Sequence, residues 1–263
     1  MKIRDFFNGF PLGISSVICR KTKKAALLKF FEEIRPVTTN SPLIRFGGDG
    51  DGGYLLPDDL FGIDACFSPG VAKTADFEAQ IAAKGIRCFM ADYSVDSAPI
   101  DHPLFYFEKR YLGPTNDGIF MTLENWVNRN APSSNDLILQ MDIEGSEYAV
   151  ILESDDSLLK RFRILVIEFH NLEDLWQERG YQVIRLSFLK LLKHFEIVHI
   201  HPNNKVKPLA QQGVEIPPLL EFTFLRRDRA NKRTATTTFP HPLDRQNIRS
   251  KKDFSLPSCW YGL

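Results

Sequence analysis

Residues 137–148 have the sequence LILQMDIEGSEY, in which a short apolar run is followed directly by an acid-rich turn and the start of a helix-like stretch. An apolar run of this length, bounded by a turn, is typical of a strand buried in a parallel sheet. From residue 60 onward, similar runs alternate with helix-like stretches, which is the pattern of parallel strands joined by crossover helices. The sequence therefore predicts an α/β fold. Its seven expected strands are Asp64–Phe67, Arg87–Ala91, Phe105–Lys109, Leu137–Met141, Ile164–Phe169, Phe195–Ile200 and Leu219–Leu225.

Helical spacing predicts the elements that connect these strands. Ala75–Lys84 has the spacing of a helix and ends at Gly85, a residue type that commonly stops helices. Further helices are expected at Thr122–Asn130, from Glu147 to about Leu152, and across Leu172–His194. Gly180 should break the last of these in two. No helix is evident between the last two strands, so we expect them to pair antiparallel, with the loop around Pro202–Pro218 as their connection.

The composition is that of an ordinary globular protein. The chain has 263 residues, of which 43% are hydrophobic and 25% charged, and this argues against disordered, collagen-like and membrane-spanning classes. Its 33 basic and 33 acidic residues give no net charge, so no overall field would draw the chain to nucleic acid or to an anionic membrane. The four cysteines lie far apart, without the spacing of a zinc site or a disulfide scaffold. A reducing, cytoplasmic location is the simplest interpretation.

Both ends of the chain differ from the predicted α/β region. Phe10–Cys19 is mostly apolar, but a basic cluster follows it instead of preceding it, so it does not fit a secretory signal. We expect a helical extension over residues 1–42, with Ala25–Ile34 as its best helix, and a main domain over residues 43–225. A basic C-terminal tail, residues 226–263, is expected to pack on that domain. No segment is long and apolar enough to span a bilayer.

Polar residues follow the first two predicted strands. In an open parallel sheet, ligands bind beyond the carboxyl ends of the strands. Ser68-Pro69-Gly70-Val71 follows the first strand as a tight turn, which would expose backbone N–H groups to a carboxylate or phosphate. Asp92 follows the second strand, at about the spacing from Gly70 at which an acidic side chain accepts hydrogen bonds from a ribose. Both features also occur as ordinary turns and caps.

Acidic residues and a histidine follow the fourth and fifth predicted strands. Asp142 comes directly after the fourth strand, and Glu168 and His170 lie at the end of the fifth. Carboxylates and an imidazole that converge at a sheet edge can bind a divalent ion or act as a general base. Asp142 is also well placed to cap a helix, and we expect Glu147 to be an exposed residue with no role in a site.

A glycine-rich segment, residues 47–54, precedes the first predicted strand. It contains Asp51-Gly52-Gly53-Tyr54, and its glycines let the backbone bend sharply and approach a ligand closely. The segment lacks the later acidic ligands and the closing glutamate of an EF-hand calcium loop. It is also compatible with a plain surface loop.

Two histidines and two asparagines end the sixth predicted strand. His199 and His201 lie on the same side of an extended chain, and Asn203 and Asn204 follow them. Taken alone, this pattern describes a strand end followed by an Asn-rich turn.

In their order along the chain, these segments resemble the FkbM-type S-adenosylmethionine-dependent methyltransferases, over about residues 43–245. The segments most specific to the family are Asp51-Gly52-Gly53-Tyr54, Met141–Tyr148, Val166–His170, and His201-Pro202-Asn203-Asn204 leading into Glu221-Phe222-Thr223. The resemblance implies a Rossmann-like, seven-stranded methyltransferase sheet, mostly parallel with an antiparallel last strand. The chain departs from the family in its first loop, where the usual glycine-rich segment is reduced to Phe67–Val71.

The resemblance also implies an activity, which is transfer of a methyl group from S-adenosylmethionine to a sugar hydroxyl on a glycan or a glycosylated small molecule. The residues expected to hold the cofactor are Asp51, Gly52, Gly53, Tyr54, Ser68, Pro69, Gly70 and Asp92. The residues expected to act on the acceptor are Asp142, Glu168, His170 and His201. In one version Asp142, Glu168 and His170 bind magnesium or manganese, and in the other His170 or His201 takes the proton without a metal.

Other classes have less support from the sequence. A non-methyltransferase protein that binds nucleotides or nucleotide-sugars would use the same sheet edge, but the G-x-G-x-x-G and G-x-x-x-x-G-K-[ST] motifs are both missing. The interpretation as a nucleic-acid-binding module is supported by the basic tail alone, and runs of charged residues are usually exposed to solvent. We therefore expect a small-molecule or glycan acceptor and no nucleic acid. Peripheral contact with a membrane stays open, and the sequence does not define the oligomeric state.

Overall fold

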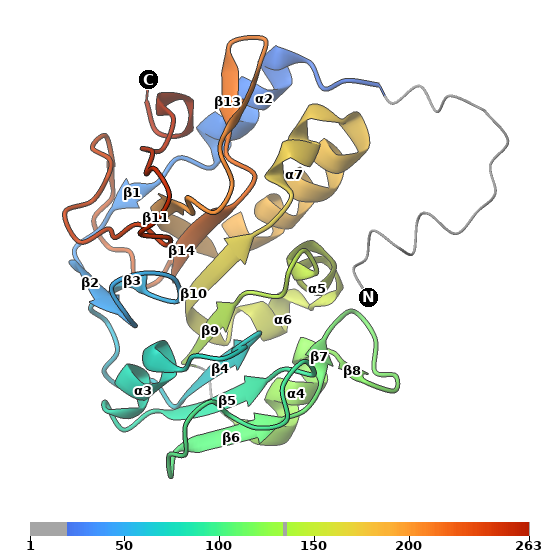
Figure 1. Ribbon diagram of the computed structural model, residues 1–263, viewed down its shortest axis with the longest axis vertical. Helices are drawn as coiled ribbons and strands as arrows, with labels where there is room; N and C mark the ends of the chain where they lie inside the picture. The colour runs from blue at the N-terminus through green and yellow to red at the C-terminus, as the bar shows by residue number, and fades with distance from the viewer. Residues whose placement is uncertain (1–19, 134–135, 263) are drawn as a thin grey trace, which may run out of the picture.

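The computed structural model describes residues 20–133 and 136–262, and its centre is a seven-stranded sheet (Figure 1). The strands of this sheet are β4 (Ala65–Pro69), β5 (Arg87–Ala91), β6 (Phe105–Glu108), β9 (Leu137–Met141), β10 (Phe162–Phe169), β11 (Phe195–Pro202) and β14 (Leu220–Arg226). All seven predicted strands are present, and each predicted range overlaps one of them, with ends that differ by at most two residues.

The strand order is β11-β14-β10-β9-β4-β5-β6. Strands β6, β5, β4, β9 and β10 are parallel, whereas β14 is antiparallel to both β10 and β11. This confirms the Rossmann-like α/β class and the antiparallel last strand. The chain runs outward from β4 through β5 to β6 and then returns to β9 on the other side of β4. Ligand sites of such sheets lie at this reversal, beyond the carboxyl ends of β4 and β9.

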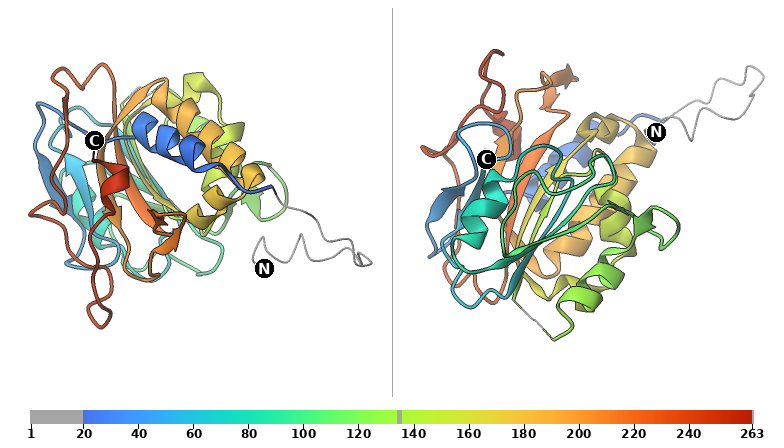
Figure 2. Two further views of the ribbon diagram at one scale, coloured as in Figure 1. Left: turned by 90° about the horizontal axis from the view of Figure 1, so that it is seen from above. Right: turned by 60° about the horizontal axis from the view of Figure 1, so that its bottom comes forward.

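Helices cover mainly one face of the sheet, as the view from above in Figure 2 shows. The helices are α2 (Lys24–Glu33), α3 (Asp76–Ala82), α4 (Leu123–Asn130), α5 (Glu147–Glu153), α6 (Asp156–Leu159) and α7 (Glu178–Leu192), with 3₁₀ turns η1 (Leu172–Trp176) and η2 (Ser258–Trp260). Residues of α2, α4, α5 and α7 pack into one apolar core. The opposite face is covered by α3 and by short strands.

The break predicted at Gly180 lies elsewhere. The chain changes direction at Gln177, between η1 and α7, and Gly180 lies inside α7. A Cβ atom on Gly180 would come 2.4 Å from the carbonyl oxygen of Asp174. This glycine therefore lets η1 fold back closely onto α7 and does not end a helix.

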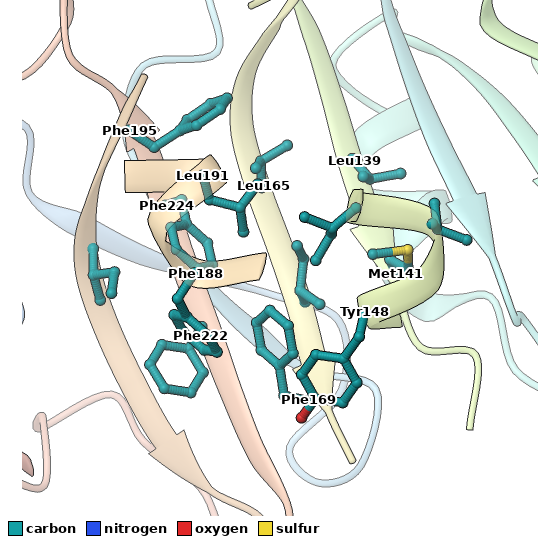
Figure 3. Packing of buried hydrophobic residues seen from close by; sticks show 14 of the residues in the cluster. Leu139, Met141, Tyr148, Leu165, Phe169, Phe188, Leu191, Phe195, Phe222 and Phe224 are labelled. Atoms are coloured by element: carbon teal, nitrogen blue, oxygen red, sulfur yellow. The ribbon is translucent and has the colours of Figure 1, made fainter. Parts of the chain in front are cut away.

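Alternation along β10 separates an apolar face from a polar one. Leu165, Ile167 and Phe169 point toward the helices, and Phe169 lies 4.5 Å from Phe188 between ring centroids (Figure 3). Glu168 points to the other face, because successive side chains of a strand alternate. There it is opposite Glu221 of β14, which in turn is opposite His201 of β11. The register thus aligns three ionisable side chains in one row across the sheet.

Short strands and the tail cover this polar face. The strand pairs are β2 (Leu43–Phe46) with β3 (Tyr54–Pro57), β1 (Val37–Thr38) with β15 (Thr234–Ala235), β7 (Tyr111–Leu112) with β8 (Phe120–Met121), and β12 (Leu209–Gln211) with β13 (Val214–Ile216). The hydroxyl of Thr223 in β14 donates to the carbonyl of Leu55 in β3 at 2.7 Å. The hairpin β2–β3 is therefore fixed directly onto the sheet.

The tail is bound to the rest of the molecule at both of its ends. Trp260 is buried against Phe31 of α2, with ring centroids 4.4 Å apart. Ion pairs connect its basic residues to acids elsewhere: Arg226 with Asp136, Arg227 and Arg233 with Glu196, and Arg229 with Asp59. Much of the basic character noted in the sequence is therefore neutralised within the chain. The domain limits at residues 42 and 225 stay a prediction, and residues 1–19 of the expected extension lie outside the described residues.

No helix among the described residues is long and apolar enough to cross a membrane. Cys66, Cys88 and Cys259 are free thiols, and Cys66 lies opposite Cys88 in the β4–β5 pair.

Candidate active site

The turns after β4 and β9 are in direct contact at the reversal of the sheet. Gly70 follows β4 with φ +91°, and its N–H donates to the carbonyl of Ala91 at 2.9 Å. A Cβ atom at this position would lie 1.7 Å from the carbonyl oxygen of Asp142. Only glycine fits both the backbone angle and the space. The predicted turn therefore lies where the fold expects a ligand.

Ser68 does not serve as predicted. Its side chain is fully buried, and its hydroxyl oxygen lies 2.5 Å from Oε1 of Gln140 and close to the carboxyl of Glu78. Burial raises the pKa of Glu78, although the hydrogen bond that its carboxyl accepts from Ser68 opposes this shift. Ser68 is thus part of a buried polar network beneath the turn and is not available to a cofactor.

Asp92 holds the turn after β4 in place. Its carboxylate accepts hydrogen bonds from the backbone N–H of Ala72 at 3.0 Å and of Ser94 at 2.7 Å. Each bond uses a different carboxylate oxygen, so each oxygen keeps a second acceptor position. The side chain is 6% exposed and lies beside the turn of Gly70. These features fit a residue that accepts hydrogen bonds from the two hydroxyls of a ribose.

The glycines before Tyr54 are explained by the loop itself. A Cβ on Gly53 would lie 2.1 Å from the carbonyl oxygen of Gly48, and Gly52 has φ +76°. The guanidinium of Arg45 lies inside the loop and donates to the carbonyl of Gly48 at 2.7 Å. Gly52 and Gly53 therefore allow a tight connection between β2 and β3. Contact with a cofactor is not needed to explain them.

Tyr54 is a core residue whose hydroxyl reaches the polar face. Its ring packs edge-on against Phe77, and its hydroxyl accepts a hydrogen bond from Nε2 of Gln140 at 3.2 Å. Burial, followed by the negative charge of Asp142, raises the pKa of Tyr54 well above its usual range. Tyr54 therefore stays a neutral phenol within the sheet core.

Three carboxylates meet at the edge of the polar face, and we call Asp51, Glu168 and Glu221 the carboxylate cluster. One oxygen of each lies within 4.8 Å of the others. The amide of Asn203 donates to Glu168 at 2.9 Å, and that of Asn247 donates to Glu221 at 2.6 Å. Both amides also face Asp51, at 3.4 and 3.2 Å. The two asparagines thus satisfy carboxylates that would otherwise only repel one another.

Burial governs the protonation of this cluster. It raises the pKa of Glu168 well above the usual range, and the charges of Asp142 and Glu221 add to the effect. Burial also raises the pKa of Glu221 to about 7, although the nearby His201 opposes this shift. The fold therefore favours protons on these carboxyls near neutral pH.

His170 is oriented by a buried carboxylate. Its Nδ1 lies 3.1 Å from Oε1 of Glu147, and this same oxygen accepts the N–H groups of Ile143 and Gly145, each at 3.1 Å. The glutamate therefore receives Nδ1–H, which leaves the lone pair on Nε2. That nitrogen faces Asp142 Oδ1 at 3.7 Å. An imidazole with a free Nε2 beside a carboxylate has the arrangement of a general base.

The charges around His170 favour its protonated form. Burial alone would lower the pKa of His170, but the hydrogen bond to Glu147 and the charges of Glu147 and Asp142 raise it above its usual value. Burial, together with Glu147 and Glu144, raises the pKa of Asp142 to about 6 despite the opposing charge of His170. A proton taken up by Nε2 is therefore stabilised by two neighbouring carboxylates.

His201 does not join His170. It lies on β11 with His199, and its Nε2 contacts Oδ1 of Asn247 at 3.2 Å while its Nδ1 faces Oδ1 of Asp244 at 3.5 Å. Burial alone would lower the pKa of His201, but Asp244 and Glu221 raise it to about 9. A cationic imidazole cannot accept a proton at neutral pH, so the structure argues against the predicted role of His201 as a base.

A comparison with family models identifies one segment of the chain. Residues 121–211 match the methyltransferase FkbM domain. The matched segment runs from β8 to β12, so it includes Asp142, Glu147, Glu168 and His170 but not Asp92. The FkbM resemblance inferred from sequence motifs is thereby confirmed, and the match supports a methyltransferase.

Solved methyltransferase structures align with this chain at low similarity. A putative DNA modification methyltransferase encoded within an Escherichia coli prophage aligns over 69% of this chain and 52% of its own, with 10% identity and a TM-score of 0.39. The 16S rRNA (adenine(1408)-N(1))-methyltransferase of Catenulisporales acidiphilia aligns over 69% of this chain and 97% of its own, with 12% identity and a TM-score of 0.31. The N-methyltransferase NodS of Bradyrhizobium japonicum aligns over 62% and 86%, with 11% identity and a TM-score of 0.31. This chain therefore spans about half the length of the first of these structures. No curated protein sequence matches it.

The three residues predicted to bind a metal ion within the FkbM segment do not lie together in the structure. Asp142 and His170 are grouped with Glu147, whereas Glu168 is grouped with Asp51 and Glu221. Glu168 lies inside β10 and His170 directly after its end, and the amide of Asn203 and the register with β14 hold Glu168 toward the carboxylate cluster. Asp142, Glu168 and His170 therefore do not form one cation site.

Four residues of the site escaped the sequence analysis. Glu147 was expected to be exposed, yet it is fully buried because the turn N–H groups and His170 surround it. Glu221 was part of a family segment without an assigned role. Asp244 and Asn247 lie in the tail, outside any periodic pattern. A glutamate at the first position of α5, directly after the acidic turn, was the one signal that pointed to Glu147.

Proposed function

We propose that the protein is an S-adenosylmethionine-dependent O-methyltransferase whose acceptor is a sugar hydroxyl on a glycan or a glycosylated small molecule. The observation that carries the proposal is the His170–Glu147 pair beside Asp142, at the sheet reversal where this fold binds ligands. An alcohol must lose its proton as it attacks, so it needs a base within reach. His170 offers one with its lone pair directed away from Glu147.

The residues that would hold the cofactor lie on the neighbouring strands. Gly70 brings its turn close to the backbone of Asp142, and Asp92 keeps free acceptor positions for ribose hydroxyls. When bound there, the cofactor supplies an electrophilic methyl group on a sulfonium. Neither of the two cavities beside the tail, of about 210 and 80 Å³, is lined by these residues. The cofactor is therefore assigned to the turns themselves.

Three groups of this chain would act on the acceptor. Nε2 of His170 takes the proton of the hydroxyl, and Glu147 stabilises the charge that the imidazole gains. Asp142, ionised above its pKa of about 6, accepts a hydrogen bond from the acceptor or from the imidazolium. The carboxylate and amide groups of Asp51 and Asn203 nearby are of the kind that pair with sugar hydroxyls.

Binding of S-adenosylmethionine is the first test. Isothermal titration should show binding of S-adenosylmethionine and of its demethylated product, and none of NAD or nucleotide-sugars. Asp92→Ala should weaken binding at least about tenfold, because charge-assisted hydrogen bonds contribute about 1.5–3 kcal/mol each. Asp96→Ala is the matched control, since Asp96 is an exposed acid on the same loop. Equal affinity of Asp92→Ala and wild type in folded proteins would refute the assignment.

Transfer of labelled methyl groups tests the acceptor. Saccharides and glycosylated small molecules should take up label, and His170→Gln should reduce turnover at least about a hundredfold, the size expected for a general base. Label found only in protein, nucleic acid or carboxylate acceptors would overturn the proposal that the acceptor is a sugar hydroxyl. Normal turnover by His170→Gln would show that another residue is the base.

A further inference from the structure

Two histidines of β11 and an aspartate of the tail converge on the side of the sheet away from His170. We call His199, His201 and Asp244 the histidine cluster. Oδ1 of Asp244 lies 2.8 Å from Nε2 of His199 and 3.5 Å from Nδ1 of His201. One ligand atom from each residue lies within 4.8 Å of the others, and His199 and His201 are buried. The proposed methyl transfer uses none of these residues.

The spacing within the cluster suits a tetrahedral metal ion. Zinc bonds to imidazole nitrogen and carboxylate oxygen are about 2.0–2.2 Å long, so neighbouring ligand atoms of a tetrahedral site are about 3.3–3.5 Å apart. The distance from Asp244 Oδ1 to His201, 3.5 Å, lies within this range, and the distance to His199, 2.8 Å, is shorter by about 0.5 Å. Binding of a zinc ion would therefore require shifts of only about half an ångström at Asp244.

The outer contacts of the cluster resemble those around metal ligands. A metal-bound histidine commonly donates its other ring N–H to an oxygen, which fixes the ring. Nε2 of His201 is held in this way by Oδ1 of Asn247 at 3.2 Å. The second oxygen of Asp244 accepts the backbone N–H of His241 at 2.8 Å. Both side chains are thus oriented from outside the cluster, with their remaining atoms directed into it.

An ion pair alone leaves one of these atoms without a hydrogen bond. The contact at 2.8 Å satisfies His199, but Nδ1 of His201 is buried and has no hydrogen bond in the described part of the chain. A buried polar atom without a partner is costly. A metal ion between the three side chains would satisfy His201, and a cavity of about 80 Å³ lined by His201 and Asp244 has room for a water as fourth ligand.

We propose that His199, His201 and Asp244 bind a zinc ion that fastens the C-terminal tail to β11. Two imidazoles and one carboxylate favour zinc over magnesium or calcium, which prefer oxygen ligands. The ion joins two segments more than forty residues apart in sequence. It also fixes Asn247, three residues after Asp244, against the carboxylate cluster.

The experiment uses the full chain after metal removal, titrated with zinc chloride. One zinc ion per chain should bind, and cobalt in its place should give the visible absorption of a tetrahedral site. His199→Gln and Asp244→Asn should each weaken zinc binding at least about a hundredfold. His241→Gln is the matched control, because its ring lies 5.9 Å from that of His199 outside the cluster and should leave binding within about twofold.

Limited proteolysis supplies a readout that does not depend on methyl transfer. Zinc should protect the tail of the wild-type chain from cleavage, and it should give no protection to Asp244→Asn or His199→Gln. The use of two variants with circular dichroism spectra separates loss of a ligand from loss of the fold. Failure of zinc to bind, or binding that persists in both variants and is lost in Asp142→Asn, would overturn the proposal. Preferential binding of iron(II) over zinc would overturn the choice of metal.

Discussion

At the scale of single residues, the surroundings of a side chain decide its role more than its type does. Glu147 and Glu144 belong to the same acidic turn, yet one is fully buried and the other has a side chain that is 72% exposed. Glu147 receives two backbone N–H groups and His170 on a single oxygen. The turn therefore makes Glu147 the partner of His170 and leaves Glu144 to solvent.

Replacement of this partner should change both the rate and the pH profile. In Glu147→Gln the negative charge that raises the pKa of His170 is lost, so that pKa should fall. Because a base acts in its neutral form, the acidic limb of kcat/KM should move to lower pH. The rate on its plateau should fall about 10–100-fold, since the imidazole is less firmly oriented.

Histidine NMR titration measures the pKa without an acceptor. Glu144→Gln is the matched control, because Glu144 lies 3.8 Å from Nε2 in solvent and its charge is screened. It should shift the His170 titration much less than Glu147→Gln does. Equal shifts in the two variants would contradict the role given to Glu147.

Buried acids should make the stability of the protein depend on pH. Glu221 has a pKa of about 7 in the fold, above its ordinary value, so the folded state binds a proton that the unfolded state releases. Stability should therefore fall as pH rises from about 4.5 to about 7, by at most about 1.4 kcal/mol per pH unit for this proton.

Urea denaturation at a series of pH values measures this slope. Glu221→Gln cannot ionise, so its free energy of unfolding should vary less between pH 4.5 and 7 than that of the wild type. A steeper slope in the variant, or stability of the wild type that rises over this interval, would contradict the assignment.

Only part of the site could be predicted from the sequence. Asp142, Glu168 and His170 could be found because each lies at or directly after the end of an apolar strand, where ligands bind in this type of sheet. Their partners could not be found in this way, because the contact of Glu168 with Glu221 depends on the register of β10 with β14, and η1, α7, β11, β12 and β13 lie between these two strands in the chain. Hydrophobic periodicity is insensitive to register across strands.

At the scale of elements, the strands were predictable because a strand buried on both faces appears in the sequence as a short apolar run. Every residue of β4, β9 and β10 is buried, so each is a mostly apolar run. The polar residues inside these runs have hydrogen bonds: Ser68, Gln140, Arg163 and Glu168. Short pairs such as β1 with β15 left no such trace, because two exposed or half-buried residues form each strand. Their pairing depends on where the tail lies.

The contact between the turns after β4 and β9 can be tested with one glycine. Gly70→Ala introduces a Cβ 1.7 Å from the carbonyl oxygen of Asp142 at φ +91°, so the two turns must move apart. We expect a loss of stability of at least about 3 kcal/mol, or severe loss of S-adenosylmethionine binding if the turns separate without unfolding.

Gly85→Ala is the matched control for the backbone angle. Gly85 has φ +79° but no atom within 4 Å of its Cβ position, so this variant should lose only about 1–2 kcal/mol. Chemical denaturation and titration calorimetry measure the two effects. Similar losses in both variants would show that the turns are not in tight contact.

At the scale of the whole molecule, the two ends of the described chain pack against each other. Helix α2 and the tail lie side by side in Figure 1, and Phe31 contacts Trp260 directly. The same tail reaches the carboxylate cluster through Asn247 and β11 through Asp244. Residues on both sides of the main sheet therefore depend on one segment that has little regular structure. Sequence patterns do not place such a segment, because no period marks its contacts.

Removal of Trp260 should measure how much the closure contributes. Trp260 is fully buried between α2 and the sheet, and its indole N–H donates to the carbonyl of Glu215 at 3.1 Å. Trp260→Ala should cost about 3–5 kcal/mol, because it leaves a large cavity and removes this hydrogen bond. Trp260→Phe keeps most of the apolar volume and should cost less.

Phe61→Ala is the surface control, since Phe61 is 97% exposed, and it should change stability by less than about 0.5 kcal/mol. Urea denaturation compares the three variants, and a Trp260→Ala protein as stable as Phe61→Ala would show that the tail is not part of the cooperative fold.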